Sequence, residues 1–371
     1  MKILIVSPIL ISSEGCIIPE ITTIKETMMY TMCMGFVENG HQVTLATAYE
    51  YQPVSEETGY VCEVLFFKSN LPRVFRPSVL QLSFSFYKYL RSNHHHFDLV
   101  VMSETFTIHT WFASIVCPSK TVIWQEMAFH QRKFKKIPSK LWHRVIVPLF
   151  IRRVKCVIPR SDKARSFIGK YFKNVSVESV DHGINIETFA YSREKRRQFI
   201  CTSRLVYLKN VEGIIGTFNR LIKIKGYEDC QLLLAGKGNY REFLEQLVKQ
   251  LNLEEHVLFL GFLTHKDLNN KIKESLALLV NTRMDLNMVS IPEAIVSGTP
   301  IVTNMLPISS GYINREKLGI AKDNWNEFDL IDIIENNHIY VGNCINYREK
   351  LTNRYCAARI VEIFSHFYFP L

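Results

Sequence analysis

Short apolar runs alternate with longer segments of helical periodicity along the chain. In the first half, the runs that predict strands are 2–6, 42–46, 61–67, 99–102, 121–124 and 156–158. Strands that are apolar throughout and separated by helices are typical of parallel sheets covered on both faces. The first half is therefore predicted to be a doubly wound α/β domain.

The same alternation begins again after a charged, linker-like stretch at 190–197. The second set of predicted strands is 199–202, 231–235, 257–260, 276–280 and 299–303. Between the first two, one helical stripe carries apolar residues at Val211, Ile214, Ile215, Phe218, Leu221 and Ile222. We expect two Rossmann-like domains, 1–188 and 189–354, that face each other across a cleft, with ligands at the carboxyl ends of the strands.

The charge of the chain is concentrated in one segment. The 371 residues are 47% apolar, and this ordinary apolar fraction excludes a mainly disordered protein. The chain carries a net charge of +10. Twelve basic residues and one acid lie within 132–165, interleaved with apolar residues. This composition favours a helix lying on an anionic membrane surface, while a solvated helix face or a groove for a phosphorylated acceptor stays open. Nucleic acid is the least favoured partner, because no recognised module accompanies the charge.

The cysteines and the length of the apolar runs indicate where in the cell the protein is expected to work. The nine cysteines are scattered and form no C-x-x-C pair, so we expect neither a disulfide framework nor a zinc knuckle, and a reducing compartment. The longest apolar runs are far shorter than the roughly 20 residues that span a bilayer. We therefore expect a cytoplasmic protein, peripheral on the inner face of the cell membrane.

Two other ligand classes are weakly indicated. A dinucleotide site needs G-x-G-x-x-G after a strand, but the loop after the first strand offers only Gly15. Three consecutive histidines, 94–96, would point to alternate faces of a strand, and no other ligand stands at suitable spacing before Asp98. No metal site is predicted.

Four features of the second half follow one another in a fixed order. They are Ser203-Arg204-Leu205 with Lys209; Leu234-Ala235-Gly236-Lys237-Gly238; Phe259-Leu260-Gly261-Phe262; and Asp285, then Glu293-Ala294 and Gly298-Thr299-Pro300. In this order and spacing the chain resembles GT-B glycosyltransferases of the retaining family 4 type. The first half resembles them more loosely, through 182–185, His-Gly-Ile-Asn, at the domain junction.

The resemblance implies that a nucleotide-diphosphate sugar is the donor, UDP- or GDP-linked, with no cofactor. A departing diphosphate develops negative charge, and fixed cations stabilise it. Arg204 follows a strand and Lys209 begins the next helix, so both can reach one diphosphate. The alternative is that both are solvated surface charges.

The two acids of the family motif correspond here to Asp285 and Glu293. The resemblance implies that Glu293 accepts hydrogen bonds from the ribose hydroxyls and that Asp285 lies near the hexose hydroxyls. Pro292 suits a helix start, so Glu293 could instead be a simple capping residue. Asp285 stands where the family has glutamate, which shortens its reach.

The loop between the two acids departs from the family. Met288 stands where relatives carry a glycine, and its side chain would fill space beside the donor sugar. The amides of Asn287, Met288, Val289 and Ser290 could still donate to the phosphates. Lys237, Phe262 and Leu263 are expected near the nucleobase, although the aromatic ring could equally belong to the core. Gly236 is expected to help bind the donor.

The first domain is expected to hold the acceptor. Glu126 aligns best with a histidine that relatives place beside the reacting centre, and His130 is the second candidate. Glu126 could equally form a salt bridge at the strand end, and Gly15 could let the backbone approach the diphosphate or be a plain turn residue. The resemblance implies retention by front-side attack, without a covalent nucleophile, and a final helix, 355–371, that packs back on the first domain.

The sequence thus predicts a retaining glycosyltransferase that extends a saccharide or lipid-linked saccharide in surface polysaccharide biosynthesis. A non-catalytic scaffold of the same fold is one alternative, favoured by Asp285 and the missing glycine. A nucleotide-sugar epimerase of the same fold is another.

Overall fold

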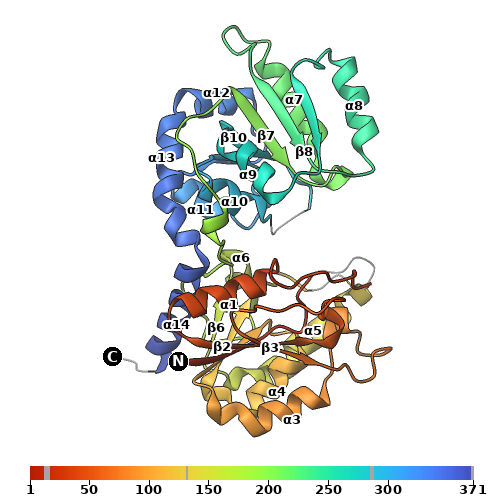
Figure 1. Cartoon of the computed structure of the whole chain (residues 1–371), viewed down its shortest axis with the longest axis vertical. Coiled ribbons are helices and arrows are strands. Elements are labelled where there is room, and N and C mark those ends of the chain that lie inside the picture. Colours follow the sequence, from red (N-terminus) through yellow and green to blue (C-terminus); the bar gives the residue numbers. More distant parts are fainter. Residues whose placement is uncertain (12–16, 131–132, 285–287, 369–371) are drawn as a thin grey trace. The chain divides into compact units, whose positions relative to one another are not determined.

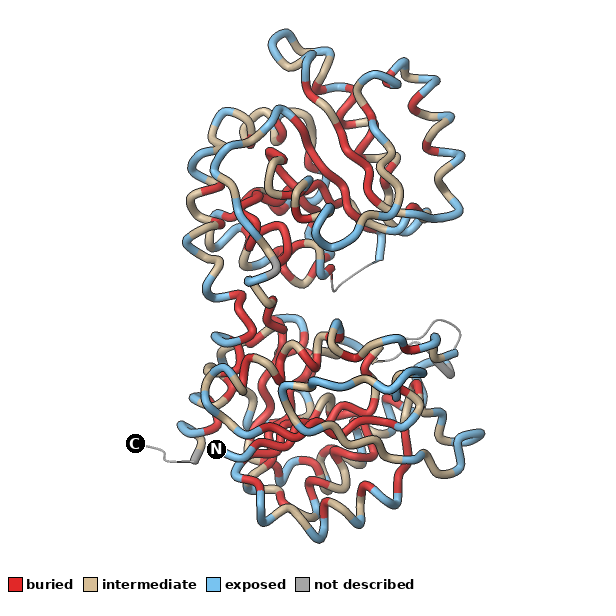
Figure 2. Tube along the Cα trace, viewed as in Figure 1, coloured by how far each residue is buried: buried red, intermediate tan, exposed pale blue. Residues whose placement is uncertain are grey.

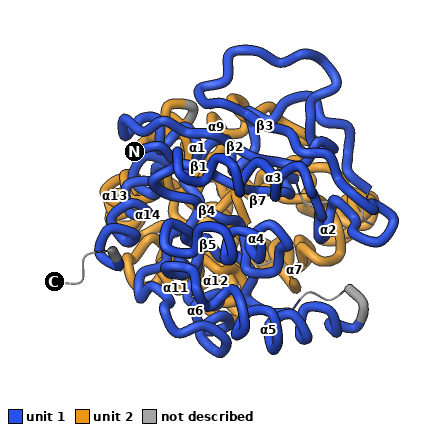
Figure 3. Tube along the Cα trace, turned by 90° about the horizontal axis from the view of Figure 1, so that it is seen from below, with its two compact units in different colours: residues 1–183, 352–371 blue, residues 184–351 orange. Residues whose placement is uncertain are grey.

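The computed structural model describes residues 1–11, 17–130, 133–284 and 288–368 (Figure 1). The chain forms two compact units, shown in different colours in Figure 3. Unit 1 comprises Met1–Gly183 and Thr352–Leu371, and unit 2 comprises Ile184–Leu351. Each unit has its own sheet and its own hydrophobic cores.

Unit 1 contains a parallel sheet of six strands in the order β3-β2-β1-β4-β5-β6. The strands are β1 Lys2–Val6, β2 Gln42–Ala48, β3 Glu63–Phe67, β4 Leu99–Ser103, β5 Thr121–Gln125 and β6 Cys156–Pro159. All six strands predicted from the sequence are confirmed. The order reverses between β1 and β4, which is where doubly wound folds bind ligands at the carboxyl edge.

Four helices of unit 1 begin at short polar caps. Thr27, Ser83, Thr107 and Ser161 each precede a helix and accept a hydrogen bond from an amide of its first turn. The helices are α1 Met28–Glu38, α2 Pro77–Leu80, α3 Phe84–Asn93, α4 Ile108–Val116, α5 Ile137–Leu149, α6 Asp162–Ile168 and α14 Asn353–Tyr368.

Successive residues of β1 point to opposite faces of the sheet and enter different cores. Ile3 and Ile5 pack with α1 and α14, whereas Leu4 and Val6 pack in the core on the other face. Figure 2 shows the central strands of the sheet as buried. Burial on both faces explains why β1 is apolar from Ile3 to Val6.

Unit 2 repeats this plan with the order β12-β11-β10-β7-β8-β9. Its strands are β7 Gln198–Thr202, β8 Gln231–Ala235, β9 Val257–Gly261, β10 Ala277–Val280, β11 Ile301–Thr303 and β12 Gly319–Ala321. Its helices are α7 Val211–Leu221, α8 Arg241–Gln250, α9 His265–Lys273, α10 Ser290–Val296, α11 Ser310–Arg315, α12 Glu327–Glu335 and α13 Asn337–Tyr347. The five predicted strands are confirmed, and β12, only three residues long, is a sixth that the pattern did not reveal.

The chain returns to unit 1 at its end, where α14 packs against α1. Asn39 Nδ2 donates to the Arg354 carbonyl at 2.8 Å, and Ala357, Ile360 and Phe364 join the unit 1 core. A Cβ on Gly183 would lie 2.1 Å from Asn353 Cα, so only glycine allows the start of α14 to approach so closely. Within the described residues, no helix combines the length and the apolarity that crossing a membrane requires.

Candidate functional site

Three loops of unit 2 meet at the carboxyl ends of β7, β8 and β9. The Leu205 amide donates to the Lys237 carbonyl at 2.9 Å, and the Gly236 amide donates to the Gly261 carbonyl at 2.7 Å. These bonds join the loop that carries Arg204 to the loops that carry Lys237 and Phe262. The residues predicted on separate motifs therefore share one edge of the sheet.

Glycine is required where the first two of these loops cross. Gly236 has φ +146°, and a Cβ built on it would lie 1.9 Å from the Ser203 carbonyl oxygen. A Cβ on Gly238 would lie 2.0 Å from the Leu205 carbonyl oxygen. The Gly-Lys-Gly sequence therefore lets the β8 loop press against the main chain that leads from Ser203 to Leu205.

The cationic side chains of the predicted donor site lie beside this crossing. Arg204 is exposed in the loop after β7, and Lys209 ends the short 3-10 turn η7, Tyr207–Lys209, just before α7. Asn210 connects η7 to α7 in the left-handed conformation, with φ +49°. Both cations therefore stand in the single connection between β7 and α7.

An exposed aromatic ring follows β9. Phe262 is 74% exposed, and Lys237 Nζ lies 5.7 Å from the centre of its ring. A largely exposed ring gains little from core packing, so the core alternative for Phe262 is not supported. Lys237 and Phe262 instead offer a cation and a flat apolar face to the solvent.

Glu293 lies in α10 and is buried. Its residue is 9% exposed, and its side chain has no hydrogen bond within the described part of the chain. Burial raises the pKa of its carboxyl to about 7. A buried carboxyl without a hydrogen-bond donor is ready to accept one from a ligand hydroxyl.

The residues before Glu293 divide between core and solvent. Met288 is 7% exposed and packs with Ile291 and its neighbours in the core of unit 2, whereas Val289 is exposed and Ser290 begins α10. The structure therefore directs the Met288 side chain into the core. The predicted site residues Asp285 and Asn287 lie outside the described residues, as does Gly15 in unit 1.

Sequence reasoning missed Arg283, which follows β10. Its guanidinium lies 4.0 Å from the centre of the Tyr207 ring and donates to Glu212 Oε1 at 2.8 Å. These contacts fix η7, which carries Lys209, to the loop after β10. Only the strand order of the sheet brings Arg283 to this site, because β10 lies beside β7 although the two strands are far apart in the sequence.

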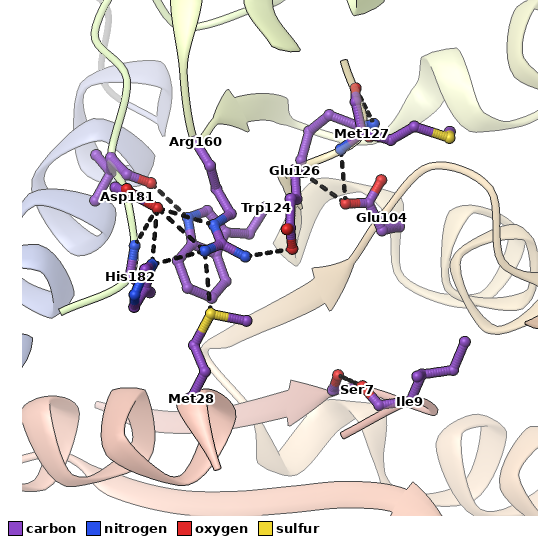
Figure 4. A network of polar contacts seen from close by, with 12 residues as sticks. Ser7, Ile9, Met28, Glu104, Trp124, Glu126, Met127, Arg160, Asp181 and His182 are labelled. Atoms are coloured by element: carbon purple, nitrogen blue, oxygen red, sulfur yellow. Dashed lines mark hydrogen bonds and ion pairs between the residues drawn. The ribbon is translucent and has the colours of Figure 1, made fainter. Parts of the chain in front are cut away.

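In unit 1, the predicted catalytic residue Glu126 forms an ion pair at the end of β5. Arg160 Nη1 donates to Glu126 Oε2 at 2.5 Å (Figure 4). Arg160 follows β6, is 4% exposed, and its guanidinium lies 4.7 Å from the centre of the Trp124 ring. The salt bridge expected as the alternative for Glu126 is therefore present.

Arg160 also contacts the segment that precedes the junction between the units. It donates to Asp181 Oδ1 at 3.1 Å and contacts His182 Nδ1 at 2.8 Å. Burial would lower the pKa of Arg160, but the carboxylates of Glu126 and Asp181 outweigh burial and raise it. Likewise, burial would raise the pKa of Asp181, yet His182 and Arg160 hold it below its ordinary value.

Glu104 fixes the main chain beside this network. It follows β4 with φ +71°, and its Oε1 accepts hydrogen bonds from the amides of Glu126 at 2.6 Å and Met127 at 3.0 Å. Burial and the nearby Glu126 charge raise the pKa of Glu104 to about 8, although the two amides oppose them. Its Oε2 atom and the buried Nε2 atom of His182 have no partner within the described residues.

His130, the second predicted catalytic residue, is held by two hydroxyl groups. Its Nδ1 lies 3.1 Å from Ser139 Oγ, and its Nε2 lies 3.0 Å from Tyr171 Oη. Burial lowers its pKa, and the charges of Lys140 and Arg144 add to the effect. Both ring nitrogens are therefore occupied, and no hydrogen bond or ion pair joins His130 to the Arg160 network among the described residues.

The basic segment 132–165 does not present all of its charge to solvent. Arg160 is buried in the network above, and Arg165 pairs with Asp162 at 2.8 Å. On α5, by contrast, exposed apolar side chains recur every fourth residue at Ile137, Leu141, Val145 and Leu149. Lys140 and Arg144 are exposed on the same helix. Arg160 therefore does not contribute its charge to the surface that was predicted to bind a membrane.

The described residues also bear on metal binding. No group of three or more His, Cys, Asp or Glu side chains among them could hold a metal ion. The three consecutive histidines form a 3-10 turn, η2 His94–His96, shortly before β4. Their rings pack on one another, with centroids of His95 and His96 3.9 Å apart.

Comparison with known proteins agrees with this geometry. Residues 185–349 match the family of glycosyl transferases group 1. An uncharacterised glycosyltransferase of Methanocaldococcus jannaschii is 25% identical over 142 residues, 38% of this chain and 36% of that protein. The O-antigen chain mannosyltransferase RfbU of Salmonella typhimurium is 22% identical over 188 residues, 50% of this chain and 52% of that protein. The chain thus spans about a third to a half of the length of these relatives.

Among solved structures, Anabaena HepE in complex with UDP superimposes with a TM-score of 0.65 and 16% identity, over 98% of this chain and all of that one. Sucrose-phosphate synthase from Thermosynechococcus elongatus gives a TM-score of 0.64 with 14% identity, over 99% of both chains. These likenesses cover both units and confirm the expected fold. The chain therefore has the GT-B fold, and its second unit belongs to the glycosyl transferases group 1 family.

Proposed function

We propose that the chain is a retaining glycosyltransferase that transfers a sugar from a nucleotide-diphosphate donor to a saccharide or lipid-linked saccharide. The observation that carries this proposal is the crossing of the β7 and β8 loops at Gly236. The crossing gathers the cation-bearing loop, Lys237 and Phe262 at one sheet edge, inside the residues that match the family.

In this proposal, Arg204 and Lys209 bind the diphosphate and stabilise the charge that develops as the sugar departs. Charge-assisted hydrogen bonds of this kind contribute about 1.5–3 kcal/mol each. The amides of 287–290 add hydrogen bonds to the phosphates, and Asp285 contacts the sugar. Because the Met288 side chain packs in the core, it does not fill the space beside the sugar, and only the main chain lines that space in this proposal.

Glu293 binds the ribose hydroxyls, Gly236 lies in the donor site, and the nucleobase packs near Lys237 and Phe262. Donor hydroxyls supply the hydrogen bonds that the buried carboxyl lacks, so donor binding favours its ionised form. The exposed ring and the adjacent cation suit the flat face of a base. UDP is the favoured nucleotide, because the similar HepE binds it, and GDP is the second.

Unit 1 binds the acceptor in this proposal. Arg160 holds the Glu126 carboxylate in place, so Glu126 acts by hydrogen bonding to a sugar hydroxyl. His130 is the second residue proposed to contact the substrates, and Gly15 is proposed to approach the diphosphate. Retention then proceeds by front-side attack, without a covalent intermediate.

The enzyme claim is tested by thermal shift and transfer assays over a panel of nucleotide sugars. We expect UDP or GDP to raise the melting temperature, and Lys209→Ala to abolish transfer without changing the melting temperature of the free protein. Lys223→Ala, an exposed lysine elsewhere in unit 2, serves as the matched control. If no nucleoside diphosphate stabilises the protein, the proposal fails.

Two further outcomes identify other functions of the same fold. Conversion of the donor without any acceptor would assign an epimerase. Normal nucleotide binding with no turnover over a broad panel of acceptors would assign a scaffold. Either outcome contradicts transferase activity while leaving the donor site intact.

We also propose that the protein works on the cytoplasmic face of the cell membrane, in the synthesis of a surface polysaccharide. The support is the exposed apolar stripe of α5 between exposed cations, which suits an anionic lipid surface. The relative RfbU is an O-antigen chain mannosyltransferase, which agrees with a lipid-linked saccharide as acceptor.

Flotation with vesicles tests the membrane contact. We expect Leu141→Ser with Leu149→Ser to reduce binding to anionic vesicles at unchanged thermal stability, because both side chains are exposed. Phe84→Ser with Ile115→Ser removes two exposed apolar residues from other helices of unit 1 and should leave binding intact. Equal binding by all three proteins would contradict the contact.

A further inference from the structure

A pocket of about 350 Å³ opens at the amino-terminal edge of the unit 1 sheet. Ser119 lies in η3, Pro118–Lys120, directly before β5, and Lys155 directly precedes β6. The Lys155 amide donates to the Thr121 carbonyl at 2.9 Å, which fixes these two segments to each other. Arg152 and Arg153 of η5, Ile151–Arg153, complete this side of the pocket.

Three of the residues that line the pocket are cationic, and no acidic residue lines it in the described part of the chain. Arg152 and Arg153 are exposed, and neither guanidinium has a hydrogen bond or an ion pair with the described residues. Other arginines of the same basic segment are paired, Arg160 with Glu126 and Arg165 with Asp162. Two guanidinium groups that have no partner among the described residues thus lie at this pocket.

We propose that this pocket binds the phosphate group of a phosphomonoester or diphosphate. Arginine presents a planar fork of donors that matches two phosphate oxygens, and two adjacent arginines with a lysine can surround a doubly charged group. Asn174 adds a neutral polar side chain, and Phe367 of α14 forms an apolar wall for the part of the ligand that bears no charge. The volume suits a small ligand.

This pocket is separate from the site proposed for transfer. Glu126 and Arg160 follow the carboxyl ends of β5 and β6, whereas the pocket lies where these strands begin. A strand of five residues spans about 13 Å, so one phosphate cannot contact both edges. The pocket shares Arg152, Arg153 and Lys155 with the segment proposed to contact the membrane, but it needs neither that contact nor transferase activity.

Calorimetric titration of the full chain with inorganic pyrophosphate tests the proposal. Since pyrophosphate could also enter the proposed donor site, the titration is done with Arg204→Ala/Lys209→Ala. We expect Arg152→Gln/Arg153→Gln, added to this background, to weaken the remaining binding about tenfold or more. Ser119→Trp, which fills the pocket without changing its charge, should weaken it similarly.

The control is Arg73→Gln/Arg76→Gln, which removes the same charge from two exposed arginines elsewhere on unit 1. It should leave pyrophosphate binding within about twofold, since only distant charge is lost. Equal weakening by the control and the pocket variants, or no binding in the donor-site background and none to the vesicles below, would overturn the proposal.

Vesicles distinguish the source of the phosphate. Vesicles with phosphatidic acid carry the phosphomonoester on a lipid, and phosphatidylcholine vesicles are the neutral reference. Binding of pyrophosphate that depends on Arg152 and Arg153 supports a soluble phosphorylated ligand. Binding to phosphatidic acid vesicles alone, lost in Arg152→Gln/Arg153→Gln and Ser119→Trp but kept in the control, supports a lipid headgroup.

Discussion

At the scale of single residues, position 236 is the place where the structure most clearly requires a glycine. Its φ of +146° disfavours any side chain, and the Ser203 carbonyl oxygen occupies the place of a Cβ. Gly226 has a comparable φ of +97°, but nothing lies within 4 Å of the corresponding Cβ. A side chain at Gly226 would therefore cause backbone strain alone, whereas a side chain at Gly236 would cause both backbone strain and a steric clash.

We predict that Gly226→Ala lowers the free energy of unfolding by about 1–3 kcal/mol, the usual effect of backbone strain. Gly236→Ala should lower it further, because the Ser203 main chain must move, and should also abolish nucleotide binding. Urea denaturation and thermal shift with UDP measure the two effects. Equal losses of stability in the two variants would show that the loop crossing tolerates a side chain.

Burial of Glu293 is expected to lower the stability of the protein at neutral pH, although the same carboxyl is proposed to bind the donor. Its pKa rises from 4.5 to about 7 in the folded protein, so the folded state holds the proton more tightly than the unfolded state. Stability contributed by this residue is therefore full below about pH 4.5 and is lost as the pH rises to about 7. The difference amounts to about 3 kcal/mol.

We predict that Glu293→Gln stabilises the protein at pH 8 by about 1–3 kcal/mol, has little effect at pH 4.5, and abolishes transfer. Urea denaturation at the two pH values, together with the transfer assay, provides the measurement. The matched control is Glu254→Gln, which makes the same change at an exposed position between α8 and β9 and should leave stability nearly unchanged at both pH values. A pH dependence of stability that is identical in the wild type and Glu293→Gln would contradict the assignment.

At the scale of elements, the Arg160 network joins the ends of β5 and β6 to the segment before Gly183. Replacing Arg160 by methionine leaves two carboxylates without their shared cation. We predict a loss of about 3 kcal/mol in Arg160→Met, as for other ion pairs broken from one side. Arg165→Met breaks the more exposed pair with Asp162 and should lose less than about 1 kcal/mol. Urea denaturation of the two variants measures the difference, and equal losses would contradict a structural role for the buried network.

The acid limb of the denaturation curve adds a second readout for this network. The pKa of Asp181 lies below its ordinary value, so its stabilising effect is full above about pH 4 and is lost as the pH falls. In Arg160→Met this pKa moves toward the ordinary value, and stability should depend less on pH in the acid range. An unchanged acid limb would show that Arg160 does not stabilise the Asp181 carboxylate.

Elements were predictable where local pattern and burial agree. β1 and β8 are apolar after their first residue and have the bounds that the sequence indicates. β12 has three residues, one of them glycine, and its pairing with β11 depends on tertiary contact. The Arg160 network was missed for the same reason, because Glu126, Arg160 and Asp181 meet only through the sheet order, and the sequence shows Arg160 merely as one more basic residue.

At the scale of the whole molecule, the two units differ in how the chain builds them. Unit 2 is one continuous segment, Ile184–Leu351, whereas unit 1 is completed by the end of the chain. Ile360, Ile363 and Phe364 of α14 lie in the unit 1 core beside α1. Burying three such side chains contributes about 5–9 kcal/mol, which is comparable with the whole stability of an ordinary domain.

A chain that ends at Leu351 should therefore lose the structure of unit 1 and keep that of unit 2. Limited proteolysis followed by mass spectrometry tests this, with a chain that ends at Tyr368 as the control for truncation itself. We expect the shorter chain to be digested up to the start of unit 2 while a fragment close to 184–351 survives, because unit 2 has its own sheet and cores. Survival of residues 1–183 would show that α14 is dispensable for unit 1, and loss of both units would show that unit 2 depends on unit 1 for its stability.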